Sequence, residues 1–348
     1  MNEQPACSPP AAPPLLSVRG LSKHFPNSAR GLWARPAGTT RAVTDVSFDL
    51  QPGETLGLVG ESGSGKTTTV RCILRALAPT AGQVFFRKTD GGTVDLAALP
   101  EGALKPLRPQ MQMIFQDPFS SLNPRMTVAQ IVGEPLAIHG LAKGREREDR
   151  VDDILRKVGL KPELRTRYPH AFSGGQRQRI GIARALVMRP SFVVADEAVS
   201  ALDVSVQAQV LNLLKDLQEE FHLTYLFVAH NLDVVRNFCD RVAVMYAGRI
   251  VELAPTAALF ADPKHPYTQA LLGAVPWPDP DVKMKFDLPG EVADPNRLPP
   301  GCAFHPRCPE CFARCRAHRP ELRPLGPAAV RAEGGSGRGV ACHLYDLS

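Results

Sequence analysis

Residues 60–67 read Gly-Glu-Ser-Gly-Ser-Gly-Lys-Thr and fill every position of the phosphate-binding pattern G-x-x-x-x-G-K-[ST]. Glycines leave room for backbone N–H groups to surround a triphosphate, and the helix that follows directs its positive end at the anion. Lys66 can then reach the β- and γ-phosphates, and the hydroxyl of Thr67 can bind Mg²⁺. The pattern therefore predicts a nucleoside triphosphate site made of Gly60, Glu61, Ser62, Gly63, Ser64, Gly65, Lys66, Thr67 and Thr68.

Two carboxylates follow a second apolar segment, residues 192–195. If this segment is a strand of the same sheet, Asp196 would lie near the Mg²⁺ of a nucleotide bound at residues 60–67. Glu197 would lie beside the γ-phosphate, where it can polarise an attacking water. A strand that ends in Asp-Glu is also common at a surface edge, so the hydrolytic interpretation depends on the phosphate loop that precedes it.

The segment Phe172-Ser-Gly-Gly-Gln-Arg-Gln-Arg179 begins a helix that we expect to extend to residue 188. Serine and glycine at a helix N-terminus offer backbone donors to a second anion. A compact domain has little use for two sites on one γ-phosphate unless the second serves a neighbouring molecule. With this segment the sequence resembles the ATP-binding subunits of ABC (ATP-binding cassette) transporters, whose signature is Leu/Phe-Ser-Gly-Gly-Gln. The plain alternative is a helix capped by a serine.

The resemblance covers residues 16–254 and implies how several residues act. In the family, two cassettes dimerise head to tail, and the signature of each closes over the ATP held by the other. The resemblance makes Gln116 a sensor of Mg²⁺ and of the attacking water, and His230 a donor to the γ-phosphate. Phe25 is the aromatic expected to stack on adenine, with a plain core role as the alternative. The implied nucleotide contacts from the signature and the dimer interface are Ser173, Gly174, Gly175, Gln176 and Asp203.

We therefore expect Thr67, Gln116 and Asp196 to bind Mg²⁺. We expect Glu197, Gln116 and His230 to be the catalytic residues. One position departs from the family, because Ala198 stands where proline usually follows the catalytic glutamate. This loses a backbone restraint but no reactive group, so we expect the ATPase to be active.

Long strings that flank or extend the shared motifs resemble the oligopeptide and dipeptide importer branch: residues 115–125, 199–209, 265–272, 301–308 and 340–345. The chain is most similar to the second ATPase of such systems, which pairs with a different, related ATPase; a homodimer stays open. The resemblance implies two transmembrane permease subunits and an extracytoplasmic solute-binding protein as further partners. It implies import of di- or oligopeptides, with nickel, glutathione or glycopeptides as alternative solutes.

The order of segments predicts an α/β fold. We expect strands at 16–19, 42–50, 54–59, 83–87, 112–115, 192–195, 224–229, 241–245 and 249–253, and helices at 66–77, 127–138, 147–158, 174–188 and 206–221. The first strands lack helices between them and should form an antiparallel layer beside a RecA-like, P-loop NTPase core. The expected parts are a flexible tail at 1–14, a nucleotide-binding domain at 15–254 with a helical subdomain at 117–172, and a separate C-terminal extension at 255–348.

Composition limits the class of protein. The chain has 348 residues, is 44% hydrophobic and carries a net charge of +6. No run approaches the ~18–20 apolar residues of a membrane helix, and the start lacks the features of a secretory signal. We therefore expect a soluble subunit, peripheral to the cytoplasmic face of the cell membrane, that does not bind nucleic acid.

Five of the eight cysteines lie between Cys302 and Cys342. In a cytoplasmic chain this clustering suggests a metal site rather than disulfides. Four occupy positions where the importer branch recurrently has cysteine, Cys302, Cys308, Cys315 and Cys342, whereas Cys311 is an extra thiol of undefined role. Gaps of five and six residues are wider than those of zinc ribbons and favour a [4Fe–4S] cluster over Zn²⁺. His305, His318 and His343 keep mixed zinc ligation open, and the alternative to a metal site is that the cysteines are free thiols. For a metal site we expect a structural or docking role with little effect on ATP affinity.

Two other functions were weighed. A soluble ABC ATPase acting on nucleic acid or ribosomes predicts an inserted coiled coil or two cassettes, but 117–172 holds only a compact helical segment and one cassette is present. A catalytically inactive subunit predicts the loss of Lys66, Glu197 or His230, and all three are present.

Overall fold

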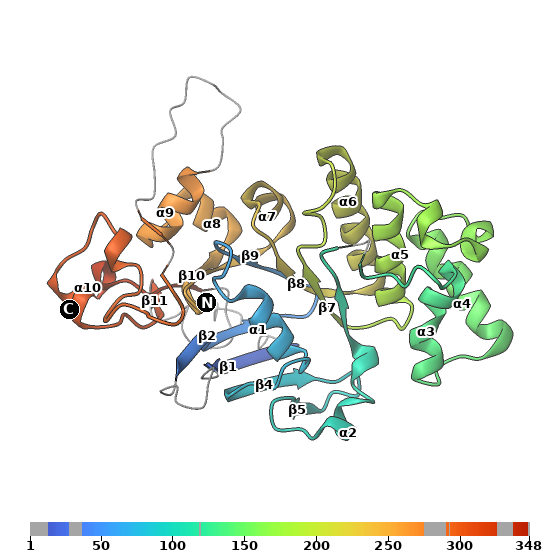
Figure 1. The fold of residues 1–348 in the computed structure, drawn as a ribbon, viewed down its shortest axis with the longest axis horizontal. Helices are drawn as coiled ribbons and strands as arrows, with labels where there is room; N and C mark the ends of the chain where they lie inside the picture. The colour runs from blue at the N-terminus through green and yellow to red at the C-terminus, as the bar shows by residue number, and fades with distance from the viewer. Residues whose placement is uncertain are drawn as a thin grey trace, which may run out of the picture.

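The chain forms two sheets, shown in Figure 1 by a computed structural model that describes residues 13–27, 37–117, 120–274, 290–291, 293–325 and 337–346. The strands are β1 (Leu16–Asn27), β2 (Ala37–Leu50), β3 (Thr55–Val59), β4 (Ala81–Arg87), β5 (Thr93–Asp95), β6 (Met111–Ile114), β7 (Phe192–Asp196), β8 (Thr224–Val228), β9 (Arg241–Tyr246), β10 (Arg249–Pro255), β11 (Arg323–Leu325) and β12 (Arg338–Val340). The α-helices are α1 (Lys66–Ile73), α2 (Glu101–Leu104), α3 (Val128–Ile138), α4 (Gly144–Lys157), α5 (Gly174–Leu186), α6 (Val204–Phe221), α7 (Leu232–Phe238), α8 (Thr256–Ala261), α9 (Pro266–Gly273) and α10 (Ala313–Ala317). Short 3-10 helices span Arg108–Gln110, Pro162–Thr166, Pro169–Ala171, His305–Arg307 and His343–Tyr345.

An eight-stranded sheet with the order β11-β12-β10-β9-β3-β8-β7-β6 runs through the molecule. β3 pairs in parallel with β8 and β9, and β7 pairs in parallel with β6 and β8. Every residue of β3, β7, β8 and β9 is buried. Parallel strands need this cover on both faces because helical crossovers connect them. The predicted α/β fold is confirmed, and the sheet is mixed, because β10 pairs antiparallel with β9 and β12.

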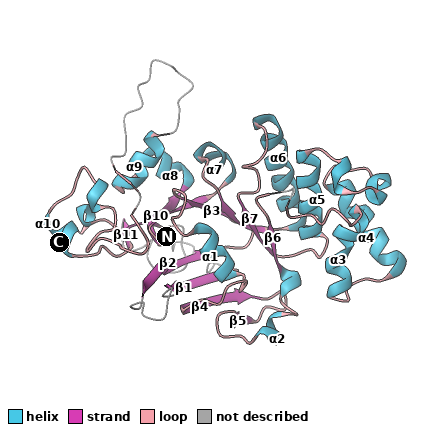
Figure 2. Cartoon of the chain, viewed as in Figure 1, coloured by secondary structure: helices cyan, strands magenta, loops and turns pink. Residues whose placement is uncertain are grey.

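Alternate residues of the central strands enter two hydrophobic cores. On β7, Phe192 and Val194 join the core beneath the antiparallel layer, whereas Val193 and Ala195 join the core that contains the helices on the other face. This follows from the two-residue period of a strand. Figure 2 shows the result, with α6, α7 and α8 on one side of the sheet and β1, β2 and β4 on the other.

The antiparallel layer has the strand order β2-β1-β4-β5, and α1 contacts both sheets. β1 and β2 extend further than the strands predicted at 16–19 and 42–50. Pro26 is tolerated in β1 because β4 pairs with β1 only as far as Ser22, so this part of the strand needs no donor on that side. Helix α1 is shorter than expected, because Arg75 adopts a left-handed φ of 54° just after it.

Helices α3, α4 and α5 form a group at the end of the molecule opposite α10 (Figure 1). Thr127 caps α3 by a reciprocal pair of hydrogen bonds with Gln130. The group packs against the sheet through α5, which contacts β6. Helix α5 thus connects this helical group to the main sheet.

The C-terminal part is continuous with the main sheet rather than separate from it. β12 pairs antiparallel with β10, so that Glu252 lies opposite Val340. The carboxylate of Glu252 is fully buried and accepts hydrogen bonds from the backbone N–H of Lys264 (3.0 Å) and His265 (2.8 Å), and from the Arg338 guanidinium (2.8 Å). One buried carboxylate on β10 thus joins the cassette to two distant stretches of the C-terminal part.

Candidate nucleotide site

The phosphate-binding loop lies between the end of β3 and the start of α1. Its glycines at positions 60, 63 and 65 all have positive φ, of 148°, 78° and 101°. A Cβ at Gly60 would lie 2.2 Å from the carbonyl oxygen of Met245, and one at Gly65 would lie 2.3 Å from that of Ala42. Because the loop is pressed against β9 and β2, only glycine fits at these two positions.

Lys66 lies across this loop with 6% of its surface exposed. Its ammonium donates to the carbonyl oxygens of Gly60 (2.7 Å) and Glu61 (3.0 Å). Burial lowers the pKa of Lys66, while Glu197 and Asp196 act to raise it. The buried hydroxyl of Ser64 has no hydrogen-bond partner among the residues that the structure describes. A triphosphate would supply the acceptors that such buried donors need.

The remaining loop residues lie where the sequence predicts them. Ser62 and Gly63 are exposed at the tip of the loop, and Thr68 is partly buried in α1. Phe25 is half-buried on β1, with the Lys23 ammonium 5.0 Å from its ring centre. The structure therefore leaves part of the Phe25 ring accessible for stacking.

Thr67 and Asp196 meet at the expected edge of the sheet. The Thr67 hydroxyl donates to the Asp196 carboxylate over 3.4 Å. Asp196 is 5% exposed, and burial, with the neighbouring charge of Glu197, raises the pKa of its carboxyl. A hydroxyl and a buried carboxylate beside a phosphate loop fit Mg²⁺, which prefers oxygen ligands and would offset the clustered negative charge.

Three catalytic candidates converge where β6, β7 and β8 end. The side-chain amide of Gln116 donates to the Glu197 carboxylate over 2.8 Å, and the Nδ1 atom of His230 lies 3.6 Å from the same oxygen. Glu197 has a φ of 49°, which is rare for a residue other than glycine. Its backbone N–H donates to the carbonyl of Val228. This turn directs the carboxylate toward Gln116 and His230, as general-base catalysis requires.

Ser173 caps α5 and is exposed. Its hydroxyl accepts from the Gln176 backbone N–H (3.4 Å), and the Gln176 side chain accepts from the Ser173 backbone N–H (3.1 Å). A Cβ at Gly175 would lie 2.6 Å from the side chain of Val206, so glycine lets α5 approach α6. Asp203 begins α6, also exposed, and is followed by Val204, which is 82% exposed. The signature and the Asp203 segment thus present an open surface that includes an apolar residue.

Two residues of the C-terminal part hold the phosphate loop, and sequence analysis did not identify them. Arg307 is 7% exposed and forms a bidentate ion pair with Glu61, with N···O distances of 3.0 and 3.3 Å. The Tyr267 hydroxyl accepts a hydrogen bond from the Glu61 backbone N–H over 2.9 Å. No local sequence signal pairs residues 246 positions apart, so only the fold could reveal this contact.

Tyr267 is itself held by aromatic packing. Its ring lies 4.7 Å from that of Tyr246 and 5.4 Å from that of Phe304, measured between ring centres. Tyr246 and Phe304 are each 1% exposed. Phe304 and Arg307 belong to the stretch between Cys302 and Cys308, so the cysteine-rich segment supports the phosphate loop directly.

Cys302, Cys308, Cys315 and Cys342 line one small cavity, and Cys311 does not. Burial raises the pKa of the Cys308 thiol to about 12 and that of Cys342 to about 11. Among the described residues, however, no group of three or more His, Cys, Asp or Glu side chains is arranged to hold a metal ion. The thiols are gathered, but they do not form a ready coordination shell.

His343 does not fit the mixed zinc site that the sequence left open. One ring nitrogen lies 2.5 Å from the Asp346 carboxylate, and the other lies 2.9 Å from the carbonyl of His318. Both nitrogens are therefore engaged.

Comparisons with known proteins agree with this architecture. Residues 43–200 match the family described as ABC transporter, and residues 251–315 match the oligopeptide/dipeptide transporter C-terminal region. The chain is 52% identical over 331 residues to the probable peptide ABC transporter ATP-binding protein y4tS of Sinorhizobium fredii, covering 95% of this chain and 90% of that protein. This chain belongs to the family of peptide ABC transporter ATP-binding subunits. A second member, the oligopeptide transport ATP-binding protein AppF of Bacillus subtilis, is 48% identical over 335 residues, or 95% of this chain and 97% of AppF.

Solved ABC cassettes share the fold of this family member. A dimeric, post-hydrolysis structure of MJ0796 bound to ADP and Pi matches with a TM-score of 0.59 and 28% identity, over 69% of this chain and 98% of that one. The structure of cbiO1 from Clostridium perfringens matches with a TM-score of 0.61 and 27% identity, over 72% of this chain and 92% of that one. The expected ABC cassette fold is therefore confirmed. In the described part of this subunit, no helix combines the length and apolarity needed to cross a membrane.

Proposed function

We propose that this subunit hydrolyses ATP to energise the import of di- and oligopeptides across the cytoplasmic membrane. The observation that carries the proposal is the convergence of Gln116, Glu197 and His230 beside Thr67 and Asp196. The names of the relatives support peptides over nickel, glutathione or glycopeptides as the solute. The presence of one cassette with all its catalytic groups disfavours a non-transport ATPase and an inactive subunit.

The chain's own residues account for the main chemical tasks. The loop 60–65 and Lys66 bind the phosphates, and Thr67, Asp196 and Gln116 are the proposed Mg²⁺ ligands, where the ion would neutralise developing charge. Glu197 accepts a proton from the attacking water, while the hydrogen bond from Gln116 fixes the direction of its carboxylate. His230, whose Nδ1 atom lies 3.6 Å from the same carboxylate, is the proposed donor to the γ-phosphate.

Titration with ATP tests the nucleotide site. Lys66→Ala should weaken ATP binding about 10–100-fold, because a charged hydrogen-bond donor contributes roughly 1.5–3 kcal/mol. Lys215→Ala, at an exposed position of α6, is the matched control and should bind as the parent does. Equal binding by parent and Lys66→Ala would place the phosphates elsewhere.

We also propose that two cassettes share each active site, with a related ATPase as the partner. The subunit would lie peripherally at the cytoplasmic face, on two permease subunits served by an extracytoplasmic solute-binding protein. The exposed, capped Ser173 and the open Asp203–Val204 surface support this assembly. Ser173→Arg should leave ATP binding by the isolated subunit unchanged and abolish hydrolysis in the complex. A trapped ATP dimer in which Ser173 approaches its own chain's phosphates would contradict the shared site.

The four gathered cysteines are the proposed ligands of a [4Fe–4S] cluster, with Zn²⁺ as the alternative. Their common cavity supports this, but the sulfurs must move together and lose their protons to bind a metal. Anaerobic purification followed by iron, sulfide and zinc analysis distinguishes the two. Zinc without iron would favour a Zn²⁺ site over the cluster. Protein that contains neither metal would contradict the proposal of a metal site.

A further inference from the structure

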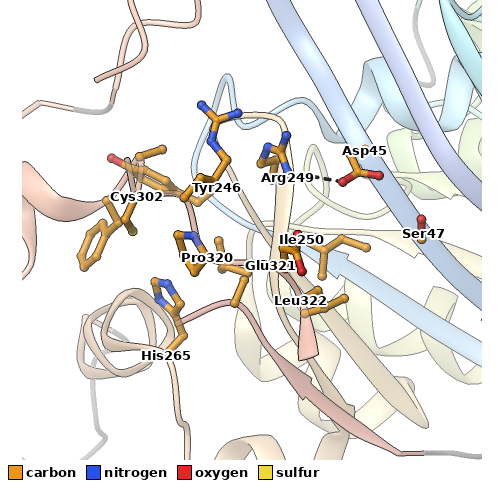
Figure 3. A pocket seen from close by; sticks show the side chains of 15 residues that line it. Asp45, Ser47, Tyr246, Arg249, Ile250, His265, Cys302, Pro320, Glu321 and Leu322 are labelled. Carbon is orange, nitrogen blue, oxygen red and sulfur yellow. Dashed lines mark ion pairs between the residues drawn. The ribbon is translucent and has the colours of Figure 1, made fainter. Parts of the chain in front are cut away.

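A cavity of about 240 Å³ lies between β2, the β9–β10 hairpin and the C-terminal part (Figure 3). Asp45 and Ser47 of β2 form one wall, and Arg249 and Ile250 lie next to them. No residue that we place in contact with nucleotide or Mg²⁺ lines this space. The cavity is therefore distinct from the ATP site.

Two guanidinium groups face the cavity. Among the described residues, Arg249 pairs with the exposed carboxylate of Asp45, at 3.6 Å, and its buried Nε atom has no hydrogen-bond partner. Arg319 lines the same space. Burial lowers the pKa of Arg249, and the nearby charges of Arg319 and Arg41 act in the same direction. Two guanidinium groups that line one partly enclosed space can bind the carboxylate of a ligand between them.

A further donor comes from His265, which is 1% exposed. Its Nδ1 atom accepts the backbone N–H of Tyr267 over 3.0 Å, and burial lowers the pKa of the ring to about 3. The neutral ring therefore carries its proton on Nε2, and this buried N–H has no hydrogen-bond partner within the described part of the chain. Leaving such a donor unpaired is costly, so a ligand acceptor in the cavity would be stabilising.

The rest of the lining limits the chemistry of the occupant. The carboxylates of Asp45 and Glu321 also face the cavity, and Tyr246, Phe304 and Leu322 provide apolar walls. Inorganic phosphate would be repelled by the two carboxylates and would leave the apolar walls without contact. A molecule with a carboxylate, an ammonium group and an apolar side chain complements all three features.

We propose that this cavity binds an apolar α-amino acid or a short peptide as a zwitterion. The ligand's carboxylate would lie on Arg249 and Arg319, its ammonium group near Asp45 and Glu321, and its side chain against Tyr246. Planar carboxylates suit the fork of a guanidinium. The proposal does not depend on what the transporter carries. It does place the ligand on Tyr246 and Phe304, two of the rings that pack against Tyr267 below the phosphate loop.

The test is calorimetric titration of the full-length, nucleotide-free chain with L-leucine and glycyl-leucine. The comparison compounds are N-acetyl-leucine, leucinamide and inorganic phosphate. We expect saturable binding of the zwitterions and weaker binding of every comparison compound. Absence of saturation, or phosphate binding as tight as leucine, would overturn the proposal. ATP titration of the same preparation reports separately on the nucleotide site.

Variants locate the binding. Arg249→Met and Arg319→Met should each weaken leucine binding about tenfold or more, the loss expected for a charge-assisted hydrogen bond. Arg316→Met is the matched control, because Arg316 is exposed on α10 and does not line the cavity. Thermal melting shows whether each variant is folded. Arg319 lines the same cavity, so Arg319→Met still decides the question if the Arg249→Met variant unfolds. Unchanged affinity in a folded Arg319→Met variant would overturn the proposal.

Discussion

The nucleotide site and the cysteine-rich segment are stabilised in different ways. In the nucleotide site, the key side chains follow buried parallel strands and pair with one another, as Thr67 does with Asp196 and Gln116 with Glu197. In the cysteine-rich segment, four thiols from short helices and loops share a cavity without a coordination shell. A sheet edge fixes polar groups at the ends of its strands whether or not a ligand is bound. A segment with so little regular structure depends on its side-chain contacts with the cassette.

Those contacts reach the phosphate loop itself. Because the cysteines follow the cassette in sequence, we expected changes among them to leave ATP affinity nearly unaltered. The ion pair of Arg307 with Glu61 argues against that expectation, since Arg307 directly precedes Cys308. The two regions differ in how they are stabilised, but they are in contact.

The largest expected effect is a loss of ATP hydrolysis when the catalytic base is removed. Glu197→Gln keeps the size and the hydrogen bonding of the side chain but removes the base, so ATP should bind while hydrolysis falls about 10²–10⁴-fold. Steady-state phosphate release by the assembled transporter measures this. Glu219→Gln, at an exposed position on α6, is the control and should hydrolyse normally. Turnover by Glu197→Gln at the parent rate would show that another group is the base.

A smaller effect tests the contact between the regions. Arg307→Met should weaken ATP binding about tenfold, because an ion pair that positions Glu61 and the loop is worth on the order of 1.5 kcal/mol. The Kd for a fluorescent ATP analogue measures it, and hydrolysis at saturating ATP should change less than the Kd. A larger change in Kd than in hydrolysis at saturating ATP would show that Arg307 positions the loop. A general loss of structure would lower both binding and hydrolysis.

The matched control is Arg314→Met, since Arg314 pairs with Asp346 inside the C-terminal part at 3.3 Å and not with the loop. Glu61→Gln combined with Arg307→Met should add little to either single change. Additive losses would mean that the two side chains act independently.

The smallest effect tests the cysteines. Cys308→Ser should lower the thermal stability of the C-terminal part and weaken ATP binding by less than Arg307→Met does, because it acts on the loop only through Arg307. Cys311→Ser should change neither quantity, since Cys311 does not line the shared cavity. Melting curves and ATP titration of both variants measure this. A larger effect of Cys311→Ser would show that the wrong four thiols were chosen.

The sequence predicts the nucleotide site well because its motifs are local. Residues 60–67 specify a loop, and an apolar strand ending in Asp196 and Glu197 specifies a sheet edge. Parallel pairing of the strands then places the phosphate loop and the two carboxylates at the same edge of the sheet. The lengths of β1 and α1 were harder to predict, because they depend on where β4 stops pairing and on the left-handed turn at Arg75.

Long-range side-chain contacts could not be predicted in this way. Arg307 lies between Cys302 and Cys308, and the local sequence does not indicate its ion-pair partner. That partner, Glu61, is 246 residues away. Likewise, β12 pairs with β10 through short segments that carry no strong strand pattern. Both contacts join segments that are far apart in the sequence, so they are properties of the fold and not of a motif.

The buried Glu252 has a consequence for the integrity of the chain. Its guanidinium partner, Arg338, lies 86 residues further along and near the end of the chain. During synthesis the cassette is complete long before Arg338 emerges, so until then this carboxylate lacks its counter-charge. Losing one partner of a buried ion pair typically costs about 3–5 kcal/mol. A prematurely terminated subunit would carry that penalty in its central sheet and would be selectively exposed to cellular proteases.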